Sequence, residues 1–220
     1  MKAWSYSSLT KFETCPFQFY RCKVLKDVVE PPTEATEWGT KVHEALEFRV
    51  RDKTPLPDWA SQWEPIAKRF DRYGDRVFCE LELGLTKNFQ QTGFFADDCW
   101  YRGIIDIGVD GTVSFLGDYK TGKVKDDHDQ LKLFAATYMS ANPHVERCKT
   151  AYLWLKFDKV SQKEFRRDEV PVIWQEFLPR IARMEAAFDA DKWVKKPSGL
   201  CRGWCPVHDC DFWRPKRTNK

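Results

Sequence analysis

Two acidic residues and a lysine lie near one another in the middle of the chain, in segments with the alternation of β-strands. Asp106 ends the run Gly103-Ile104-Ile105-Asp106, and Asp118 and Lys120 fall within Gly117-Asp118-Tyr119-Lys120. Because residues two apart on a strand point to the same side, Asp118 and Lys120 share a face. Carboxylate oxygens are the ligands that Mg²⁺ prefers, and metal-assisted hydrolysis also gains from a cation near the attacking water. The spacing therefore fits metal-dependent cleavage of a phosphodiester.

The connection between the two strands decides whether Asp106 joins the other two side chains. The pair Asp110-Gly111 is a strong hairpin signal, because both residues tolerate positive φ. A two-residue turn would send Asp106 and Asp118 to opposite faces. We therefore predict a three-residue connection from Asp110 with a glycine bulge, which pairs Asp106 with Leu116; a bulge at Gly117 would have the same effect.

Hydrophobic periodicity indicates the elements that hold this hairpin. Helical spacing recurs in five segments, about 7–26 with a break at Cys15-Pro16, 38–46, 59–70, 126–140 and 172–189. Two-residue alternation predicts five strands, about 76–85, 100–109, 112–120, 150–157 and 164–170. The residues after 190 are rich in Gly and Pro, which predicts irregular structure.

Composition limits the class of protein. Of the 220 residues, 42% are hydrophobic and 15% aromatic, enough for a folded core, and no apolar run is long enough to span a bilayer. The first residues lack the apolar run of a secretory signal, so we expect a reducing compartment, in which cysteines serve as metal ligands or free thiols. The formal charge is +3, but residues 192–220 carry eight positive and two negative side chains, hence +6. This segment could attract a polyanion or be a solvated tail.

Three of the eight cysteines cluster near the end of the chain. Cys201, Cys205 and Cys210 have the spacing C-x3-C-x4-C, and Cys15 lies far away in sequence beside a proline. Four thiolates could hold a four-iron four-sulfur (4Fe-4S) cluster or a zinc ion, with His208 as a nitrogen ligand in place of one thiolate. Either group would tie the irregular tail to the N-terminal helices. The remaining interpretation is ordinary free thiols, which we favour for Cys22, Cys79, Cys99 and Cys148.

Taken together, these segments resemble the PD-(D/E)XK nuclease superfamily, and within it the RecB-like and CRISPR-associated exonucleases that combine this core with an iron-sulfur cluster. The segments that carry the resemblance are Ser8-Leu9, Cys15-Pro16-Phe17, 39–43, 103–106, 117–123, Gln130-Leu131 and the cysteine-rich end. The resemblance implies an α/β, restriction-endonuclease-like fold: a mixed central sheet flanked by helices, with an N-terminal helical segment and an irregular C-terminal tail joined by a metal cluster. We expect a single domain over 1–220, with a helical part (1–75), a nuclease core (76–190) and a cysteine-rich basic tail (191–220).

The same resemblance implies roles for individual residues. Asp106 and Asp118 resemble the metal-binding acids, His43 an additional ligand, Glu80 a weaker candidate ligand, and Lys120 the residue that activates the water. A histidine ligand should favour Mn²⁺ over Mg²⁺.

Other expected roles concern the cluster and the nucleic acid. In the cluster-bearing relatives one cysteine precedes the core and three follow it, which favours 4Fe-4S at Cys15, Cys201, Cys205 and Cys210, with zinc as the alternative. The family glutamine is followed one turn later by tyrosine; here Phe134 holds that place and Tyr138 comes a turn later. The residues expected to contact nucleic acid are Gln130, Tyr138, Lys123 and Trp204.

These expectations describe a hydrolase, a divalent-metal-dependent deoxyribonuclease that acts as an exonuclease on single-stranded DNA or on DNA ends. We expect it in the cytoplasm of a bacterial cell or phage-infected host, away from membranes, in DNA recombination or repair. The chain has no ATPase motif, so a separate helicase or recombination protein would be its partner. The alternatives are a non-catalytic iron-sulfur or zinc-stapled nucleic-acid-binding module and a zinc-stapled protein-interaction domain.

Overall fold

The structure, a computed structural model, describes residues 3–216. The ends of the predicted domain, 1–2 and 217–220, lie outside this range, and with them Arg217 and Lys220 of the predicted basic tail. Within the described part, the chain divides into two compact units. Residues 33–176 form the first, which we call the sheet unit; residues 3–32 together with 177–216 form the second, the cysteine unit.

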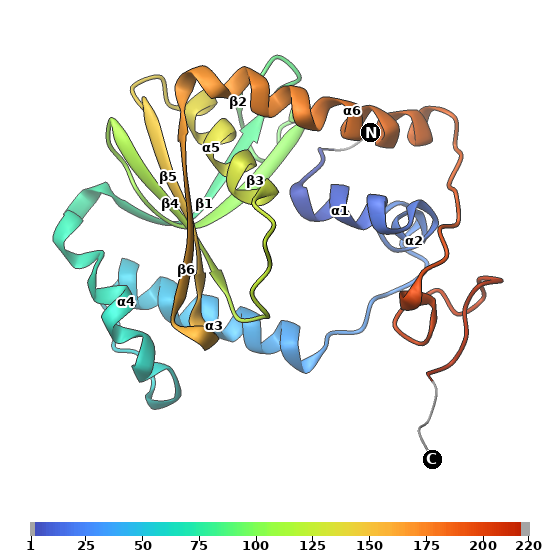
Figure 1. Cartoon of the computed structure of the whole chain (residues 1–220), viewed down its shortest axis with the longest axis horizontal. Helices are drawn as coiled ribbons and strands as arrows, with labels where there is room; N and C mark the ends of the chain where they lie inside the picture. Colours follow the sequence, from blue (N-terminus) through green and yellow to red (C-terminus); the bar gives the residue numbers. More distant parts are fainter. Residues whose placement is uncertain (1–2, 217–220) are drawn as a thin grey trace. The chain divides into compact units, whose positions relative to one another are not determined.

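Six strands form one mixed sheet among the described residues of the sheet unit, in the order β2-β1-β3-β4-β5-β6 (Figure 1). Strands β4 and β5 run parallel, and all other neighbours are antiparallel. The strands are β1 (Val77–Leu85), β2 (Gln91–Thr92), β3 (Tyr101–Val109), β4 (Val113–Lys120), β5 (Arg147–Trp154) and β6 (Lys159–Arg166). The predicted mixed α/β sheet is thereby confirmed, and β2 is too short to leave a periodic signal in the sequence.

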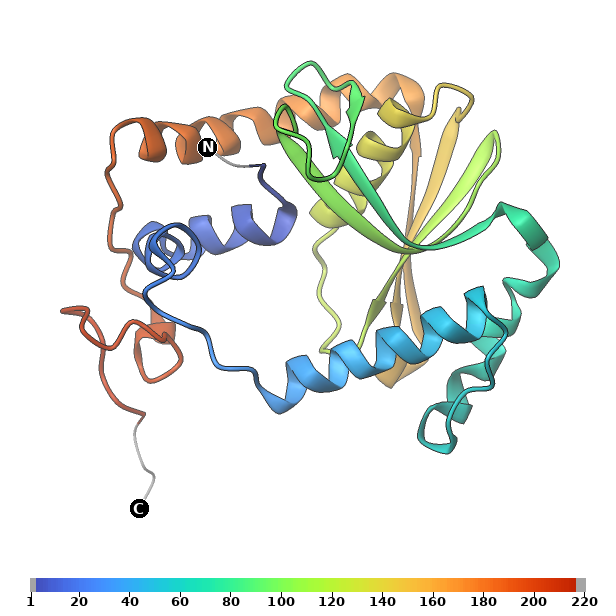
Figure 2. The ribbon, with the colours of Figure 1, turned by 180° about the vertical axis from the view of Figure 1, so that it is seen from behind.

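Helices cover both faces of this sheet (Figures 1 and 2). On one side lie α3 (Glu34–Arg51), α4 (Glu64–Lys68) and two 3-10 turns (Asp58–Trp63 and Asp71–Arg76). Helix α3 begins earlier than its apolar spacing suggests, because Thr33 and Thr36 form a capping box. Its buried residues Val42, Leu46 and Val50 share one hydrophobic core with β3, β4 and β5. On the other side α5 (Asp129–Ala141) contacts β5, β1 and β4.

The hairpin of β3 and β4 has a different register from the predicted one. Its pairs are Ile107 with Gly117 and Val109 with Phe115, so that Asp106 comes next opposite Asp118, and the predicted pairing with Leu116 is wrong. The shift is two residues, an even number, so Asp106 and Asp118 still occupy opposing positions on one face, as predicted.

The physical reason for the shift lies in the turn. Neither Asp110 nor Gly111 has positive φ. Instead, the Ser114 hydroxyl accepts a hydrogen bond from Gly111 N–H at 3.2 Å and donates one to the Gly111 carbonyl at 2.8 Å. These side-chain hydrogen bonds close a wider loop than a glycine bulge would.

The cysteine unit is helical and irregular. It contains α1 (Tyr6–Thr14), α2 (Pro16–Phe19), a π-helical turn (Tyr20–Leu25), the part of α6 (Val170–Asp189) that follows residue 176, and a 3-10 turn (Gly199–Cys201). The predicted break at Cys15-Pro16 is confirmed, since Cys15 is extended (φ −160°) and Pro16 opens α2. After α6 the described residues contain no further helix beyond that 3-10 turn, which agrees with the predicted irregular tail.

Aromatic side chains stabilise this unit. Phe12, Phe19, Phe188 and Trp193 contact one another with ring centroids 4.8 to 6.5 Å apart, mostly edge to face. Such pairs add about 0.5–1.5 kcal/mol each beyond the burial of their area. In the described part of the chain, no helix is long and apolar enough to cross a bilayer.

Candidate metal-binding active site

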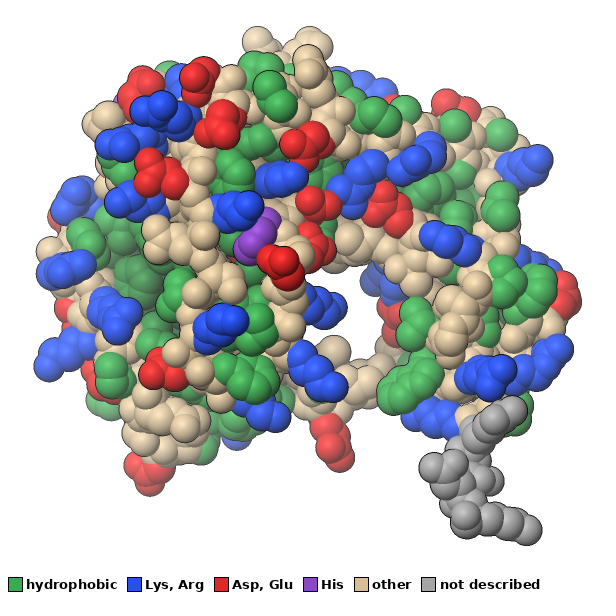
Figure 3. Space-filling view, in the orientation of Figure 1, with side chains coloured by type: hydrophobic (Ala, Val, Ile, Leu, Met, Phe, Trp, Pro, Cys, Tyr) green, Lys and Arg blue, Asp and Glu red, His purple; other side chains and the backbone are tan. Residues whose placement is uncertain are grey.

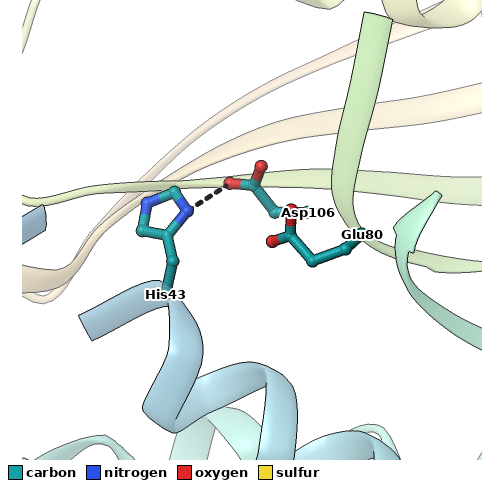
Figure 4. Close-up of side chains that lie close together, drawn as sticks. All are labelled: His43, Glu80 and Asp106. Carbon is teal, nitrogen blue, oxygen red and sulfur yellow. Dashed lines mark ion pairs between the residues drawn. The ribbon is translucent and has the colours of Figure 1, made fainter. Parts of the chain in front are cut away.

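Three ligand side chains meet where α3, β1 and β3 come together (Figure 4). His43, Glu80 and Asp106 each bring one ligand atom to within 4.8 Å of the other two. Glu80 has φ +46°, a left-handed conformation that is unusual for a non-glycine residue in a strand. Its neighbours Cys79 and Leu81 pair with Ile107 and Ile105, so Glu80 itself lies opposite Asp106. Backbone strain of this kind concentrates at functional sites.

Asp106 is almost fully buried, with 8% of its surface exposed. The regular pairing of β3 with β4 stops at Gly117, and beyond it the Asp106 Oδ2 atom accepts a hydrogen bond from Tyr119 N–H at 2.8 Å. Burial, followed by the charge of Asp118, raises the pKa of Asp106 well above its ordinary value. A buried carboxyl group of this kind gains from a bound cation, which offsets both effects.

His43 is oriented by Tyr119 of β4, the residue that also donates to Asp106. Its Nε2 atom lies 2.8 Å from the Tyr119 carbonyl oxygen, which can only accept, so Nε2 carries the hydrogen. Nδ1 then faces Asp106 Oδ2 at 3.4 Å. Burial is the main cause that lowers the pKa of His43, which favours the neutral ring with a lone pair on Nδ1. A histidine whose other nitrogen donates to a backbone carbonyl has the arrangement typical of a metal ligand.

Asp118, Lys120 and Gln130 form a second group beside the first. Lys120 Nζ lies 2.6 Å from Asp118 Oδ2 and donates to Gln130 Oε1 at 3.0 Å, while Gln130 Nε2 donates to Asp118 Oδ1 at 2.8 Å. Asp118 is buried, with 2% exposed, and burial raises its pKa although the charge of Lys120 opposes this. Within the described residues, Asp118 Oδ2 accepts no hydrogen bond of good geometry despite the close ammonium group. This oxygen is therefore suited to a cation.

Asp118 is not one of the three converging ligands, but its charge acts on each of them. It raises the pKa of Glu80 and of Asp106, and it acts in the same direction on His43, where burial outweighs it. The donors are one imidazole nitrogen and carboxylate oxygens, a set that suits Mn²⁺ and Mg²⁺.

Similarity to known proteins agrees with this geometry. The sequence profile of the PD-(D/E)XK nuclease superfamily matches residues 3–210. The chain belongs to the PD-(D/E)XK nuclease superfamily. Nucleases of this superfamily use divalent metals, and the ligand group of His43, Glu80 and Asp106 could bind one. The restriction-endonuclease-like fold is thereby confirmed.

A solved structure shows the fold of this PD-(D/E)XK nuclease in another protein. A candidate exonuclease from Eubacterium rectale is 13% identical, with a TM-score of 0.56, over 100% of this chain and 90% of its own. The protein SSO0001 is 14% identical, with a TM-score of 0.48, over 99% of this chain and 89% of its own. No curated protein matches the sequence.

The remaining predicted contacts with nucleic acid lie in different surroundings. Lys123 is exposed in the segment after β4, and Gln130 lies in the site. Tyr138 is buried, with 3% exposed; its hydroxyl donates to Asp110 Oδ1 at 2.7 Å and its ring stacks on Phe78. The structure therefore does not bring Tyr138 to the nuclease site, because two turns of α5 separate it from Gln130.

Sequence patterns gave no sign of the two backbone groups of Tyr119 or of the Tyr152 ring, whose centroid lies 5.2 Å from Lys120 Nζ. A sequence motif identifies side chains by residue type, whereas every residue has the same backbone groups, so a motif cannot point to the N–H and carbonyl of Tyr119. The Tyr152 ring comes from β5 through the parallel pairing of Asp118 with Tyr152, which only the sheet order reveals.

The four cysteines proposed as cluster ligands converge in the cysteine unit. Cys15, Cys201, Cys205 and Cys210 line one small cavity, although Cys15 is far from the others in sequence. Burial raises the pKa of Cys205, and the other three thiols of this group add to the effect. Four thiols around one cavity are typical of a metal or cluster site.

The surroundings of the other predicted thiols and of Trp204 differ from this. Cys99 and Cys148 are buried, and burial raises the pKa of Cys79 to about 11, as expected of cysteines that pack as small apolar residues. Trp204 is 69% exposed, with Lys216 Nζ 3.9 Å from its ring centroid.

Proposed function

We propose that this chain is a divalent-metal-dependent deoxyribonuclease that hydrolyses phosphodiester bonds of single-stranded DNA or of DNA ends as an exonuclease. The observation that carries the proposal is the convergence of His43, Glu80 and Asp106 beside the group of Asp118, Lys120 and Gln130. A bound metal ion supplies Lewis-acid polarisation of the phosphate and lowers the pKa of a bound water.

The residues of the chain have separate tasks. His43 Nδ1 and the carboxylates of Glu80, Asp106 and Asp118 would hold the metal. Lys120 Nζ has three hydrogens, of which one is donated to Gln130, and its ion pair with Asp118 holds the ammonium group in place, which leaves a hydrogen for the attacking water or a phosphate oxygen. The Lys120 side chain is 32% exposed, so a substrate can reach it. The ammonium group would stabilise charge that develops on the phosphate.

Two further parts of the proposal concern the identity of the metal and the contacts with DNA. We expect Mn²⁺ to support cleavage better than Mg²⁺, because an imidazole nitrogen suits Mn²⁺ more than the all-oxygen site that Mg²⁺ prefers. Equal or better cleavage with Mg²⁺ would contradict this expectation. Lys123 and Trp204 are proposed as contacts to the DNA backbone and bases, respectively.

A 4Fe-4S cluster is proposed at Cys15, Cys201, Cys205 and Cys210. Tetrahedral zinc with sulfur at about 2.3 Å would need thiolate sulfurs about 3.8 Å apart. Among residues 3–216, the only ligand atoms that gather in a group of three within 4.8 Å are those of His43, Glu80 and Asp106, so no three of these thiols lie that close together. A cluster, in which each thiolate binds a different iron, accommodates wider spacing. Analysis of iron, acid-labile sulfide and zinc in anaerobically purified protein tests this, and zinc without sulfide would overturn it.

The central experiment is cleavage of end-labelled single-stranded DNA with Mg²⁺ or Mn²⁺ added in turn. Wild type should cleave only with metal, and Asp118→Asn should not cleave. Asp126→Asn is the matched control, because its fully exposed carboxylate lies in the segment after β4. A ladder that shortens from one end supports exonuclease action. Binding of the strand by both proteins without any cleavage would instead favour a non-catalytic nucleic-acid-binding module.

A further inference from the structure

A second concave surface of the sheet unit lies away from the metal-binding residues. It is a groove of about 500 Å³ between α4 with the 3-10 turn Asp71–Arg76 and strands β4, β5 and β6. Figure 3 shows Lys and Arg side chains bordering a hydrophobic hollow at the left of the view. We call it the basic groove and define it by the cations Arg69, Arg72, Arg76 and Lys149 and the apolar residues Val113 and Val160. Its volume is in the range of ligand pockets.

The charge of the basic groove is uncompensated. Arg69, Arg72, Arg76 and Lys149 line it, and no carboxylate does. None of these four cations makes an ion pair with a carboxylate of the described residues. Nearby arginines behave differently, since Arg49 bonds both Glu64 and Asp71. The groove is therefore complementary to an anionic ligand.

The arginines of the rim are held in place. The guanidinium carbons of Arg72 and Arg76 lie 4.8 and 5.4 Å from the centre of the Tyr73 ring, and Arg72 Nη2 donates to the Tyr73 hydroxyl at 2.8 Å. The turn that carries them is anchored through Asp71, which accepts hydrogen bonds from Arg49 of α3 and from Lys53, two residues after the end of α3. Side chains fixed in this way lose little entropy when a ligand binds.

The most exposed apolar side chains of the groove are aliphatic, whereas its aromatic residues Phe70, Tyr73 and Phe115 are buried or half-buried. Val113 is 40% and Val160 50% exposed, whereas the Tyr73 ring already contacts two guanidinium groups. Single-stranded nucleic acid is normally recognised by free aromatic faces on which bases stack. Exposed valines in the same groove as four cations instead fit apolar side chains that alternate with carboxylates.

We propose that the basic groove docks an acidic peptide segment of a partner protein, in which carboxylates alternate with aliphatic side chains. The carboxylates would pair with Arg69, Arg72, Arg76 and Lys149, and the aliphatic side chains would cover Val113 and Val160. This inference goes beyond the proposed nuclease function and does not depend on it, because the groove contains none of the proposed metal ligands.

Fluorescence anisotropy of a labelled peptide in which aspartate and leucine alternate tests the proposal on the full chain, without added metal. Wild type should bind this peptide, with affinity that falls as salt is added, and should bind an aspartate-serine peptide at least about tenfold more weakly. The double variant Arg72→Glu, Arg76→Glu should bind the aspartate-leucine peptide at least about tenfold more weakly than wild type. Lys163→Glu is the matched control, because this exposed lysine of β6 does not line the groove.

A second variant tests the groove without a charge reversal that could prevent folding. Val160→Ser removes an exposed methyl pair without changing charge, and it should weaken the aspartate-leucine peptide while leaving the thermal unfolding midpoint near that of wild type. Labelled oligothymidylate is the competing ligand. If the Arg72→Glu, Arg76→Glu protein loses oligothymidylate but keeps the peptide, the groove is a nucleic-acid site and the proposal is overturned. Absence of peptide binding to wild type, or equal loss in Lys163→Glu, would overturn it as well.

Discussion

Replacement of Glu80 by glutamine tests whether the acidic side chains of the metal site repel one another when no metal ion is bound. Burial first, then the charges of Glu47 and Asp118, raise the pKa of Glu80, and the charge of Glu80 in turn raises the pKa of Asp106. Within the described residues, the Glu80 side chain makes no hydrogen bond or ion pair. Glu80→Gln therefore removes a repulsive charge and almost nothing else.

The magnitude follows from the distance. The ligand atoms of Glu80 and Asp106 lie within 4.8 Å of each other, and two unit charges at that limit interact by about 3 kcal/mol at an effective dielectric constant of about 20. Protonation of Asp106 relieves part of this repulsion, so we expect metal-free Glu80→Gln to be about 1–2 kcal/mol more stable than wild type at alkaline pH. For a chain of this size that corresponds to a rise of about 2–8 °C in the unfolding midpoint.

The pH dependence has a defined sign. A carboxyl group whose pKa is raised in the folded state contributes stability below its unfolded pKa, and that contribution is lost as the pH rises through the folded value. The difference between Glu80→Gln and wild type should therefore grow from acid toward alkaline pH. Added Mn²⁺ should reverse the order, because wild type gains about 2.7 kcal/mol at a hundred times its dissociation constant and the variant gains less.

The assay is thermal unfolding in a chelator and in Mn²⁺, with Glu82→Gln as the control. Glu82 is an exposed acid on the same strand, two residues further along β1. If chelated Glu80→Gln unfolds no higher than Glu82→Gln and still gains the full Mn²⁺ shift, the assignment of Glu80 to a self-repelling ligand group is refuted.

Further predictions concern single residues of the sheet unit. Lys120→Met should lower the cleavage rate by about 10²–10⁴-fold yet retain the Mn²⁺-induced rise in the unfolding midpoint, because the ammonium group acts on the substrate; loss of both would indicate a folding role. Tyr138→Phe should cost about 1 kcal/mol of unfolding free energy in a denaturant titration, from the lost hydrogen bond to Asp110, with unchanged cleavage; a large loss of cleavage would restore Tyr138 to the site. The Mn²⁺-induced shift should persist below the ordinary histidine pKa, because burial lowers the pKa of His43, and should disappear only at lower pH; a loss near pH 6.5 would contradict this.

The sequence predicted the common face of the two hairpin acids and the lysine, but neither the register of the hairpin nor the groups that Tyr119 and Tyr152 bring to the site. Alternation along β3 and β4 put Asp106, Asp118 and Lys120 on one face, and that result depends only on the parity of the register. The register itself was wrong by two, because hydrogen bonds of the Ser114 hydroxyl close the turn and no propensity rule anticipates them. A helical pattern likewise cannot tell whether Tyr138 is a buried core residue or a functional one, because in either case Tyr138 lies on the same helix face as Gln130.

The local conformation of the backbone was the other feature that could be predicted only in part. The break at Cys15-Pro16 was predictable because the proline acts locally on the residue before it. The strained conformation of Glu80 was not, because alternation continues through it as in an ordinary strand. Strain at a functional site is one of the features for which local preference and the folded structure disagree.

The peptide groups on either side of Tyr119 give this site an internal reporter. One donates its N–H to Asp106, and the carbonyl oxygen of the other accepts a hydrogen bond from His43. Two proposed metal ligands from different elements are therefore held by the same residue of β4. The Tyr119 amide proton should therefore exchange with solvent at a rate set by the integrity of the ligand pair, and its nitrogen chemical shift should respond when a diamagnetic ion such as Mg²⁺ binds. A single backbone resonance would then follow loading of the site without any measurement of turnover.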